Sequence, residues 1–374
     1  MLRAAALLLV ALPLSGCVTP LAWEAARVLA DVNAGGGASA LKAATPLPLR
    51  EPRIFQVADR RHVGDLYTPG QGAVGRLVMV PGFTRDGKDD ARLVELATTF
   101  ARARFQVLVP DLAASRALRV HLDDTHGIAD AAVHLAGLQL AGWQGAPPAP
   151  GVGVVAISYA AGLAVLASQA PDAKAVIRYI VAIGGYHDTT ALARFIATAN
   201  RQDGQRAAGD GQLDPAAKAM FLASNAAWLD DAQDRVTLTA LADRRIDHPG
   251  ADISDLAARL GPQGSALLSL LDNSDPAAVE ALIARQAPGV RDFLQRLSLA
   301  GRDLAHLTGR LILIHGREDR VTPASESQAL AAAVPGTQLF LIDGFSHIDP
   351  RDVGLVGQWQ LLGAVQEVLR RRGD

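Results

Sequence analysis

Three residues suited to nucleophilic catalysis each follow an apolar run that predicts a β-strand. Ser158 ends a Val-rich run, Asp319 lies in the turn His-Gly-Arg-Glu-Asp after a Leu/Ile run, and His347 ends the segment Asp-Gly-Phe-Ser-His. A serine hydroxyl alone is a poor nucleophile, so a histidine must remove its proton. A carboxylate must hold that histidine in one tautomer and stabilise its charged form. The predicted chemistry is acyl transfer, with Ser158 as nucleophile, His347 as base and Asp319 as the acid of a triad.

The turn around Ser158 has the small residues that a nucleophile turn requires. A serine raised on a sharp strand-to-helix turn needs small side chains two positions before and two positions after it. Here these are Ala156 and Ala160, where the commoner pattern is Gly-x-Ser-x-Gly, and Ala161 and Gly162 allow the following helix to approach the strand. In an alanine-rich chain this match alone favours a serine in an apolar turn over a nucleophile. Whether Ser158 is a nucleophile therefore depends on Asp319 and His347.

Two backbone N–H groups are candidates for an oxyanion hole. Stabilising the tetrahedral intermediate of acyl transfer requires preorganised donors, and losing one costs roughly 10²–10³ in rate. The residue after the nucleophile, Tyr159, supplies one donor. The segment Val-Pro-Gly-Phe-Thr after the predicted third strand supplies the other, for which Phe83 is the candidate. Only the backbone N–H of Phe83, and not its side chain, would donate to the oxyanion.

These features together resemble the α/β-hydrolase superfamily. The order Ser…Asp…His along the chain is the order in that superfamily. Pro81-Gly82-Phe83 is similar to its His-Gly-Phe segment, with proline in place of histidine, and Val107–Leu112 is similar to its fourth strand and Pro-Asp-Leu turn. The resemblance covers Ile54 to Gly184 and Leu311 to Leu369. It implies an α/β-hydrolase fold and a serine hydrolase that needs no cofactor and no metal.

The expected elements fit a mostly parallel, eight-stranded sheet flanked by helices. Short apolar runs alternate with helical stretches, as crossover connections require. The first two strands are expected to form an antiparallel hairpin at the sheet edge. The predicted strands are Ile54–Val57, Val63–Tyr67, Leu77–Val80, Gln106–Val109, Val152–Ile157, Tyr179–Ile183, Leu311–His315 and Gln338–Ile342.

Strand signals stop between the sixth and seventh strands, where a helical insertion is expected. Asp214-Pro215 and Asp275-Pro276 each pair an N-cap residue with proline at the first helical position. Apolar residues after them repeat at helical spacing. The sequence therefore predicts two core segments, 53–185 and 308–374, with a helical cap over 186–307.

The N-terminal residues resemble the signal of a bacterial lipoprotein. Arg3 precedes the apolar run Ala4–Leu12, which is too short to span a bilayer, and Leu-Ser-Gly-Cys follows. That tetrapeptide resembles a lipobox, which implies cleavage before Cys17, lipidation of Cys17 and anchoring to a membrane of the cell envelope. The alternative is an ordinary secretory signal with an incidental cysteine. Residues 1–17 are thus expected to be a signal peptide, and 18–52 a tether.

Composition excludes several other classes. The 374 residues include 49% hydrophobic residues, enough for a sizeable core, which excludes disorder by composition. A formal net charge of −2 without a long basic stretch argues against a nucleic-acid partner. One cysteine excludes a disulfide framework or a cysteine-clustered zinc site.

Several alternatives remain open at this stage. Asp188, after the sixth strand, is a second candidate for the triad acid. His121, His126, Asp123 and Asp124 either form a metal site or, as we favour, begin a solvated helix. The favoured function is an exported, lipid-anchored esterase acting on a small ester with an apolar part. The alternatives are an acyltransferase or peptidase with the same triad, or a non-catalytic surface lipoprotein.

Overall fold

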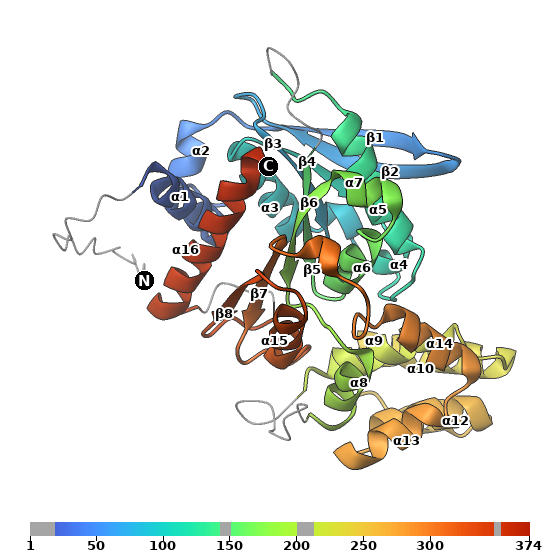
Figure 1. Ribbon diagram of the computed structural model, residues 1–374. Helices are drawn as coiled ribbons and strands as arrows, with labels where there is room; N and C mark the ends of the chain where they lie inside the picture. Colours follow the sequence, from blue (N-terminus) through green and yellow to red (C-terminus); the bar gives the residue numbers. More distant parts are fainter. Residues whose placement is uncertain (1–18, 143–150, 200–212, 348–352) are drawn as a thin grey trace, which may run out of the picture.

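A single eight-stranded sheet forms the centre of the computed structural model, which describes residues 19–142, 151–199, 213–347 and 353–374 (Figure 1). The strands lie in the order β1-β2-β4-β3-β5-β6-β7-β8, and all neighbours from β4 to β8 are parallel. The predicted mostly parallel sheet is confirmed. The strands are β1 (Leu49–Val57), β2 (Arg60–Thr68), β3 (Gly75–Val80), β4 (Phe105–Pro110), β5 (Val152–Ile157), β6 (Ile177–Ile183), β7 (Leu311–Gly316) and β8 (Gln338–Ile342).

The predicted hairpin at the sheet edge is also present. β1 pairs antiparallel with β2 along its whole length, and β2 pairs antiparallel with β4. Both strands are longer than the apolar runs predicted, because an exposed hairpin needs apolar residues on one face only. Pro52 lies within β1, and an edge strand tolerates a residue without an N–H donor.

Helices cover both faces of the sheet (Figure 1). Side chains alternate between faces along each strand, so Val154 and Ile180 pack on one face while Val155 and Val181 pack on the other. One face is covered by α1 (Pro20–Ala34), α3 (Ala91–Arg102) and α16 (Leu355–Arg370). The other is covered by α5 (Asp124–Gly137), α6 (Ala160–Ala167), α7 (Pro171–Val176) and α15 (Ala324–Ala333).

The segment expected as a tether is largely part of the folded core. Residues 20–34 form α1, whose Ala25 and Val28 are fully buried, and α1 lies beside α16 (Figure 1). Asp31 of α1 accepts hydrogen bonds from Thr99 Oγ1 of α3 at 2.6 Å and from Lys42 Nζ at 2.7 Å. The helix α2 (Ala40–Ala44) and strand β1 follow α1 in the folded structure. The prediction of a tether is therefore wrong from residue 20 onward. Cys17 lies outside the described residues.

A helical insertion separates β6 from β7, as predicted. Its helices pack on one another around their own apolar cluster, which includes Leu238, Leu241 and Leu267. None of the described helices is long and apolar enough to cross a membrane. The insertion consists of α8 (Thr189–Thr198), α9 (Pro215–Ala226), α10 (Ala232–Asp247), α11 (Ser254–Ala257), α12 (Pro262–Asp272), α13 (Val279–Ala284) and α14 (Pro288–Leu297). The insertion also contains 3₁₀ turns over Pro276–Ala278 and Ala305–Leu307, and the core contains α4 (Ala113–Arg116) and 3₁₀ turns over Gly87–Asp89 and Arg371–Gly373.

Candidate active site

Ser158 occupies the sharp turn between β5 and α6. Its φ angle is +59°, a left-handed conformation that is uncommon for residues other than glycine. Its backbone N–H donates to Ile183 O at 2.6 Å, which fixes the turn to the end of β6. The close approach of α6 depends on Gly162, since a Cβ there would lie 2.4 Å from the ring of Tyr186. The small residues noted in the sequence therefore allow the close packing of α6 that was predicted.

The structure brings Ser158, His347 and Asp319 into one hydrogen-bonded line. Ser158 Oγ lies 2.8 Å from His347 Nε2, and His347 Nδ1 lies 2.7 Å from Asp319 Oδ2. With the proton on Nδ1, His347 donates to the carboxylate and its Nε2 accepts from the serine hydroxyl. This is the arrangement in which a histidine can act as a general base. Gly184 leaves room for the imidazole, because a Cβ there would lie 3.2 Å from the ring.

Asp319 is held as a carboxylate by several donors. Its Oδ1 accepts the backbone N–H groups of Val321 at 2.7 Å and Thr322 at 3.0 Å, while Oδ2 faces His347. Burial raises the pKa of Asp319, but the charge of His347 and the hydrogen bonds from His315 and His347 outweigh burial and hold it well below its ordinary value. Asp319 therefore remains ionised throughout the range in which His347 can act.

A second buried histidine touches the same carboxylate. His315 Nε2 lies 3.3 Å from Asp319 Oδ2 and 2.9 Å from Thr322 O, and its Nδ1 lies 2.7 Å from Ser327 Oγ. No catalytic role was assigned to His315 from the sequence. Its contact with Asp319 was missed, and the spacing of four residues across the turn was the one available signal.

The candidate oxyanion donors lie on two segments that are locked together. The rings of Phe83 and Tyr159 stack at 4.0 Å with an interplanar angle of 10°. Gly82 O accepts from Ser115 Oγ at 2.9 Å, and a Cβ on Gly82 would lie 3.4 Å from the Cβ of Ser158. Among the hydrogen bonds of the described residues, neither the Phe83 nor the Tyr159 N–H donates. Both N–H groups therefore remain candidates for an oxyanion hole.

Several solved structures have a similar architecture. The structure is similar to GrgF, an α/β hydrolase from Penicillium sp. sh18, with a TM-score of 0.51 and 14% sequence identity over 87% of this chain and 99% of that one. The chain has the α/β-hydrolase fold. Also similar are a putative hydrolase from Legionella pneumophila (TM-score 0.49, 10% identity, 88% of this chain and 92% of that one) and a dienelactone hydrolase from Anabaena variabilis (TM-score 0.39, 13% identity, 87% and 97%). The sequence matches no protein-family model and no curated protein.

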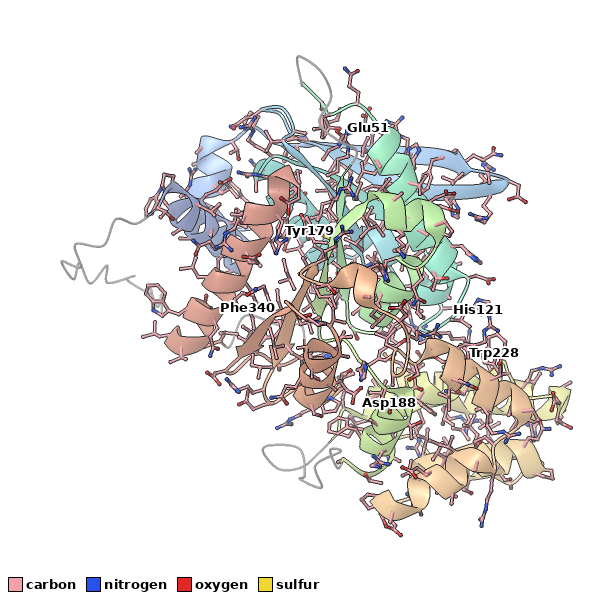
Figure 2. All side chains as sticks on the ribbon, in the orientation of Figure 1. Glu51, His121, Tyr179, Asp188, Trp228 and Phe340 are labelled. Atoms are coloured by element: carbon pink, nitrogen blue, oxygen red, sulfur yellow. The ribbon has the colours of Figure 1, made fainter. Side chains whose placement is uncertain are left out.

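In this α/β-hydrolase fold, Asp188 takes a different position from the one a triad acid needs. Its side chain accepts the N–H of Thr190 at 2.8 Å and so caps α8 at the start of the cap (Figure 2). Its own N–H donates to Glu326 Oε2 at 2.8 Å. Burial raises the pKa of Glu326, which nevertheless accepts two backbone N–H groups here. Of the two candidate acids, the structure places Asp319, and not Asp188, on His347.

A cavity of about 180 Å³ lies above Ser158 and is roofed by the cap. Ser158, His347 and Phe83 form its floor, and most of the surrounding side chains are apolar. Trp228 of the cap stacks on the ring of His121 at 5.8 Å, which fixes one side of the cap to the core (Figure 2). Within the cap, Trp228 also stacks on Phe293 of α14 at 4.7 Å. The residues that the cap contributes include Leu192, Ile196, Ala217, Met220, Phe221, Leu294 and Leu297.

The sequence around His121 also left a metal site open. In the described part of the chain, no three or more His, Cys, Asp or Glu side chains gather as metal ligands would. Asp124 departs from the solvated helix start expected for it, because it is only 7% exposed. Burial raises the pKa of Asp124 to about 7, with repulsion from Asp123 adding to the shift.

Proposed function

We propose that the protein is a serine hydrolase that cleaves carboxylic esters through an acyl-enzyme. One observation carries this proposal: the unbroken line from Ser158 Oγ to His347 at 2.8 Å and from His347 to Asp319 at 2.7 Å. The strained turn at Ser158 and the two free N–H groups beside it support the same chemistry. The Penicillium protein is by name an α/β hydrolase, which fits hydrolysis but names no substrate.

The reaction follows from the positions of these groups. Ser158 Oγ attacks the carbonyl carbon of the ester while its proton passes to His347 Nε2. The N–H groups of Phe83 and Tyr159 stabilise the negative oxygen of the tetrahedral intermediate. His347 then gives the proton to the leaving alcohol, and a water molecule activated by His347 releases the acid from Ser158. Asp319 keeps its charge throughout and stabilises the imidazolium.

The apolar cavity under the cap favours an ester with a hydrophobic part. A site of about 180 Å³ is small for a drug-sized ligand, and its apolar walls offer little to a charged peptide. An acyl or alkyl group on the ester would occupy this space and exclude water from the triad. The substrate class is therefore a small ester of an apolar acid or alcohol.

We also propose that the protein is exported and anchored by a lipid on Cys17. The support is the sequence of residues 1–17, in which the sole cysteine of the chain follows a short apolar run and Leu-Ser-Gly. Several acyl chains on one residue give stable anchoring, since each buried CH₂ contributes ~0.8 kcal/mol.

Labelling with a fluorophosphonate tests the catalytic proposal. The wild-type protein should be labelled once, and Ser158→Ala should abolish the label. Ser168→Ala is a matched control, because Ser168 Oγ lies 2.9 Å from His306 Nε2 in a serine–histidine pair to which none of the described carboxylates is hydrogen-bonded. Labelling of Ser158→Ala, or none of the folded wild-type protein, would contradict the proposal.

Hydrolysis of p-nitrophenyl butyrate then distinguishes the related activities. An esterase releases p-nitrophenol continuously in water, and the Ser158→Ala variant does not. A labelled protein that releases p-nitrophenol beyond one equivalent only when an alcohol acceptor is added is an acyltransferase. One that cleaves amides and spares esters is a peptidase. A chain that is neither labelled nor active would be a binding protein with this fold.

A further inference from the structure

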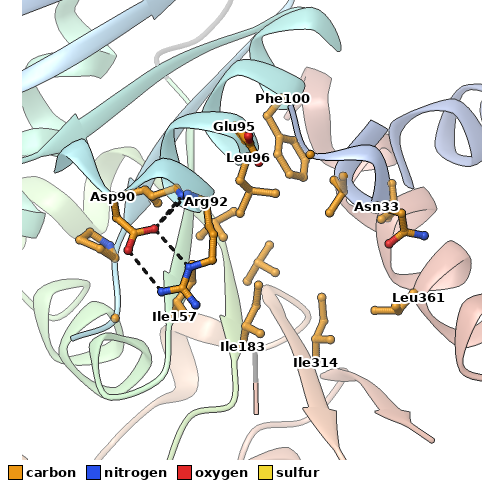
Figure 3. A pocket seen from close by; sticks show the side chains of 18 of the residues that line it. Asn33, Asp90, Arg92, Glu95, Leu96, Phe100, Ile157, Ile183, Ile314 and Leu361 are labelled. Atoms are coloured by element: carbon orange, nitrogen blue, oxygen red, sulfur yellow. Dashed lines mark hydrogen bonds and ion pairs between the residues drawn. The ribbon is translucent and has the colours of Figure 1, made fainter. Parts of the chain in front are cut away.

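A second cavity, of about 460 Å³, lies on the face of the sheet that α1, α3 and α16 cover (Figure 3). Its floor is made by side chains two residues apart on neighbouring strands, which therefore point to the same face. Ser158 lines the smaller cavity and does not line this one. The floor residues are Val155 and Ile157 of β5, Val181 and Ile183 of β6 and Ile314 of β7, and the opposite walls include Leu29 of α1, Leu96 and Phe100 of α3, and Leu361, Val365 and Val368 of α16.

The space is long, apolar and large enough for a hydrocarbon chain. From the end of β3 to β7 its floor crosses three strand spacings, roughly 14 Å at ~4.8 Å each. An apolar cavity of ~150 Å³ holds benzene, or about 25 Å³ per carbon, so 460 Å³ has room for a chain of roughly 18 carbons. The cavity is partly open to solvent, so without a ligand its apolar walls are exposed to water, which costs free energy in proportion to the apolar area. A ligand that fills it would remove that cost.

The polar residues that line this cavity favour a ligand of one charge type over another. Arg92 is paired with Asp90, with Nη2 3.2 Å from Oδ2, so this pair carries no net charge (Figure 3). Glu95 also lines the cavity and has no ion-pair partner among the described residues, while Asn33 is neutral. The remaining charge is negative. A carboxylate head group would be repelled, whereas a hydroxyl or ester group would not.

We propose that this cavity binds a single neutral alkyl chain, such as that of a long-chain alcohol or a neutral lipid, without reaction at Ser158. The inference does not depend on the proposed hydrolase activity, because Ser158 does not line this cavity. The two cavities share only Gly82 and Phe83.

Calorimetric titration of the Ser158→Ala protein with linear alcohols from hexan-1-ol to dodecan-1-ol tests the site. One molecule should bind per chain, with affinity rising up to about fourfold per added CH₂, the equivalent of ~0.8 kcal/mol. Decan-1-ol should bind more tightly than decanoate at pH 8. The absence of saturable binding, or tighter binding of decanoate, would overturn the proposal. Because Ser158 is absent, the result says nothing against the hydrolase.

Cavity-filling variants locate the bound chain. In the Ser158→Ala background, Leu96→Trp and Val365→Phe fill the space from opposite walls, and each should weaken decan-1-ol binding at least about tenfold. Leu362→Trp is the matched control, since Leu362 is a partly buried residue of α16 on the same face that does not line the cavity. Circular dichroism checks that each variant is folded. Equal loss in the control, or loss only with Met220→Trp in the catalytic cavity, would show that the chain binds elsewhere.

Discussion

Replacing Asp124 with asparagine is expected to make the stability of the protein less dependent on pH. Asp124 begins α5, is 7% exposed, and its Oδ2 has no hydrogen-bond partner among the described residues. Burial, with repulsion from Asp123, raises the pKa of this carboxyl to about 7 in the folded protein. In the unfolded chain it returns to ~3.9.

The sign of the effect follows from proton binding. Between pH 4 and about 7 the folded protein holds a proton on Asp124 that the unfolded chain has released, so the free energy of unfolding falls as pH rises. At 1.36 kcal/mol per pKa unit, the loss attributable to Asp124 between pH 5 and pH 8 is roughly 2.5 kcal/mol. Asparagine does not titrate and has nearly the same shape. The difference in unfolding free energy, variant minus wild type, should therefore increase by that amount over this range.

Urea unfolding of both proteins at several pH values from 5 to 8 measures this difference. Asp59→Asn serves as the control for the loss of a surface carboxylate, because the side chain of Asp59 is 93% exposed. A difference for Asp124→Asn that is constant, or that decreases with pH, would refute the reasoning. It would mean that Asp124 is ionised in the folded protein and is stabilised by a partner.

Further predictions concern the triad, the anchor and the cap. Asp319→Asn should reduce kcat by up to about 10⁴ with the fold intact, and Asp188→Asn should have much less effect on the chemistry; the reverse order would assign the acid role to Asp188. Cys17→Ala should block processing or release the protein from the membrane, and mass spectrometry showing an unmodified N-terminus elsewhere would exclude the lipid anchor. Met220→Trp should lower kcat/KM for p-nitrophenyl octanoate about tenfold while sparing the acetate. Leu268→Trp, within the cap but away from the cavity, should change neither, and an equal loss with both esters would argue against the cap as the determinant of chain length.

The candidate site could be predicted from sequence because its parts depend on local signals. Ser158, Asp319 and His347 each follow a short apolar strand, and the carboxyl ends of parallel strands meet at one edge of the sheet. The pairing of Ile157 with Ile183, and of Ile183 with Ile314, brings these ends level. An apolar run therefore predicts where its strand ends, whichever strands pair with it.

Features that depend on distant packing were not predictable in this way. Residues 18–52 were expected to be a tether, because the burial of α1 against α16 depends on residues at the other end of the chain. The contact between His315 and Asp319 depends on the course of the turn and on Ser327. The cavity of about 460 Å³ forms because α3 and α16 are separated from each other over the sheet. No pattern along the sequence predicts that separation.

The position of the cap also has a consequence for how the protein is made. β6 and β7 are hydrogen-bonded neighbours, yet the whole insertion lies between Ile183 and Leu311 along the chain. Contacts across such a separation form late, and domains of nascent chains fold from the N-terminus as they emerge. The turn at Ser158 and both candidate N–H donors are synthesised before the cap, whereas Asp319 and His347 are synthesised after it. A nascent or prematurely terminated chain therefore carries the serine without its base, and it should be inert toward esters until the last two strands have joined the sheet.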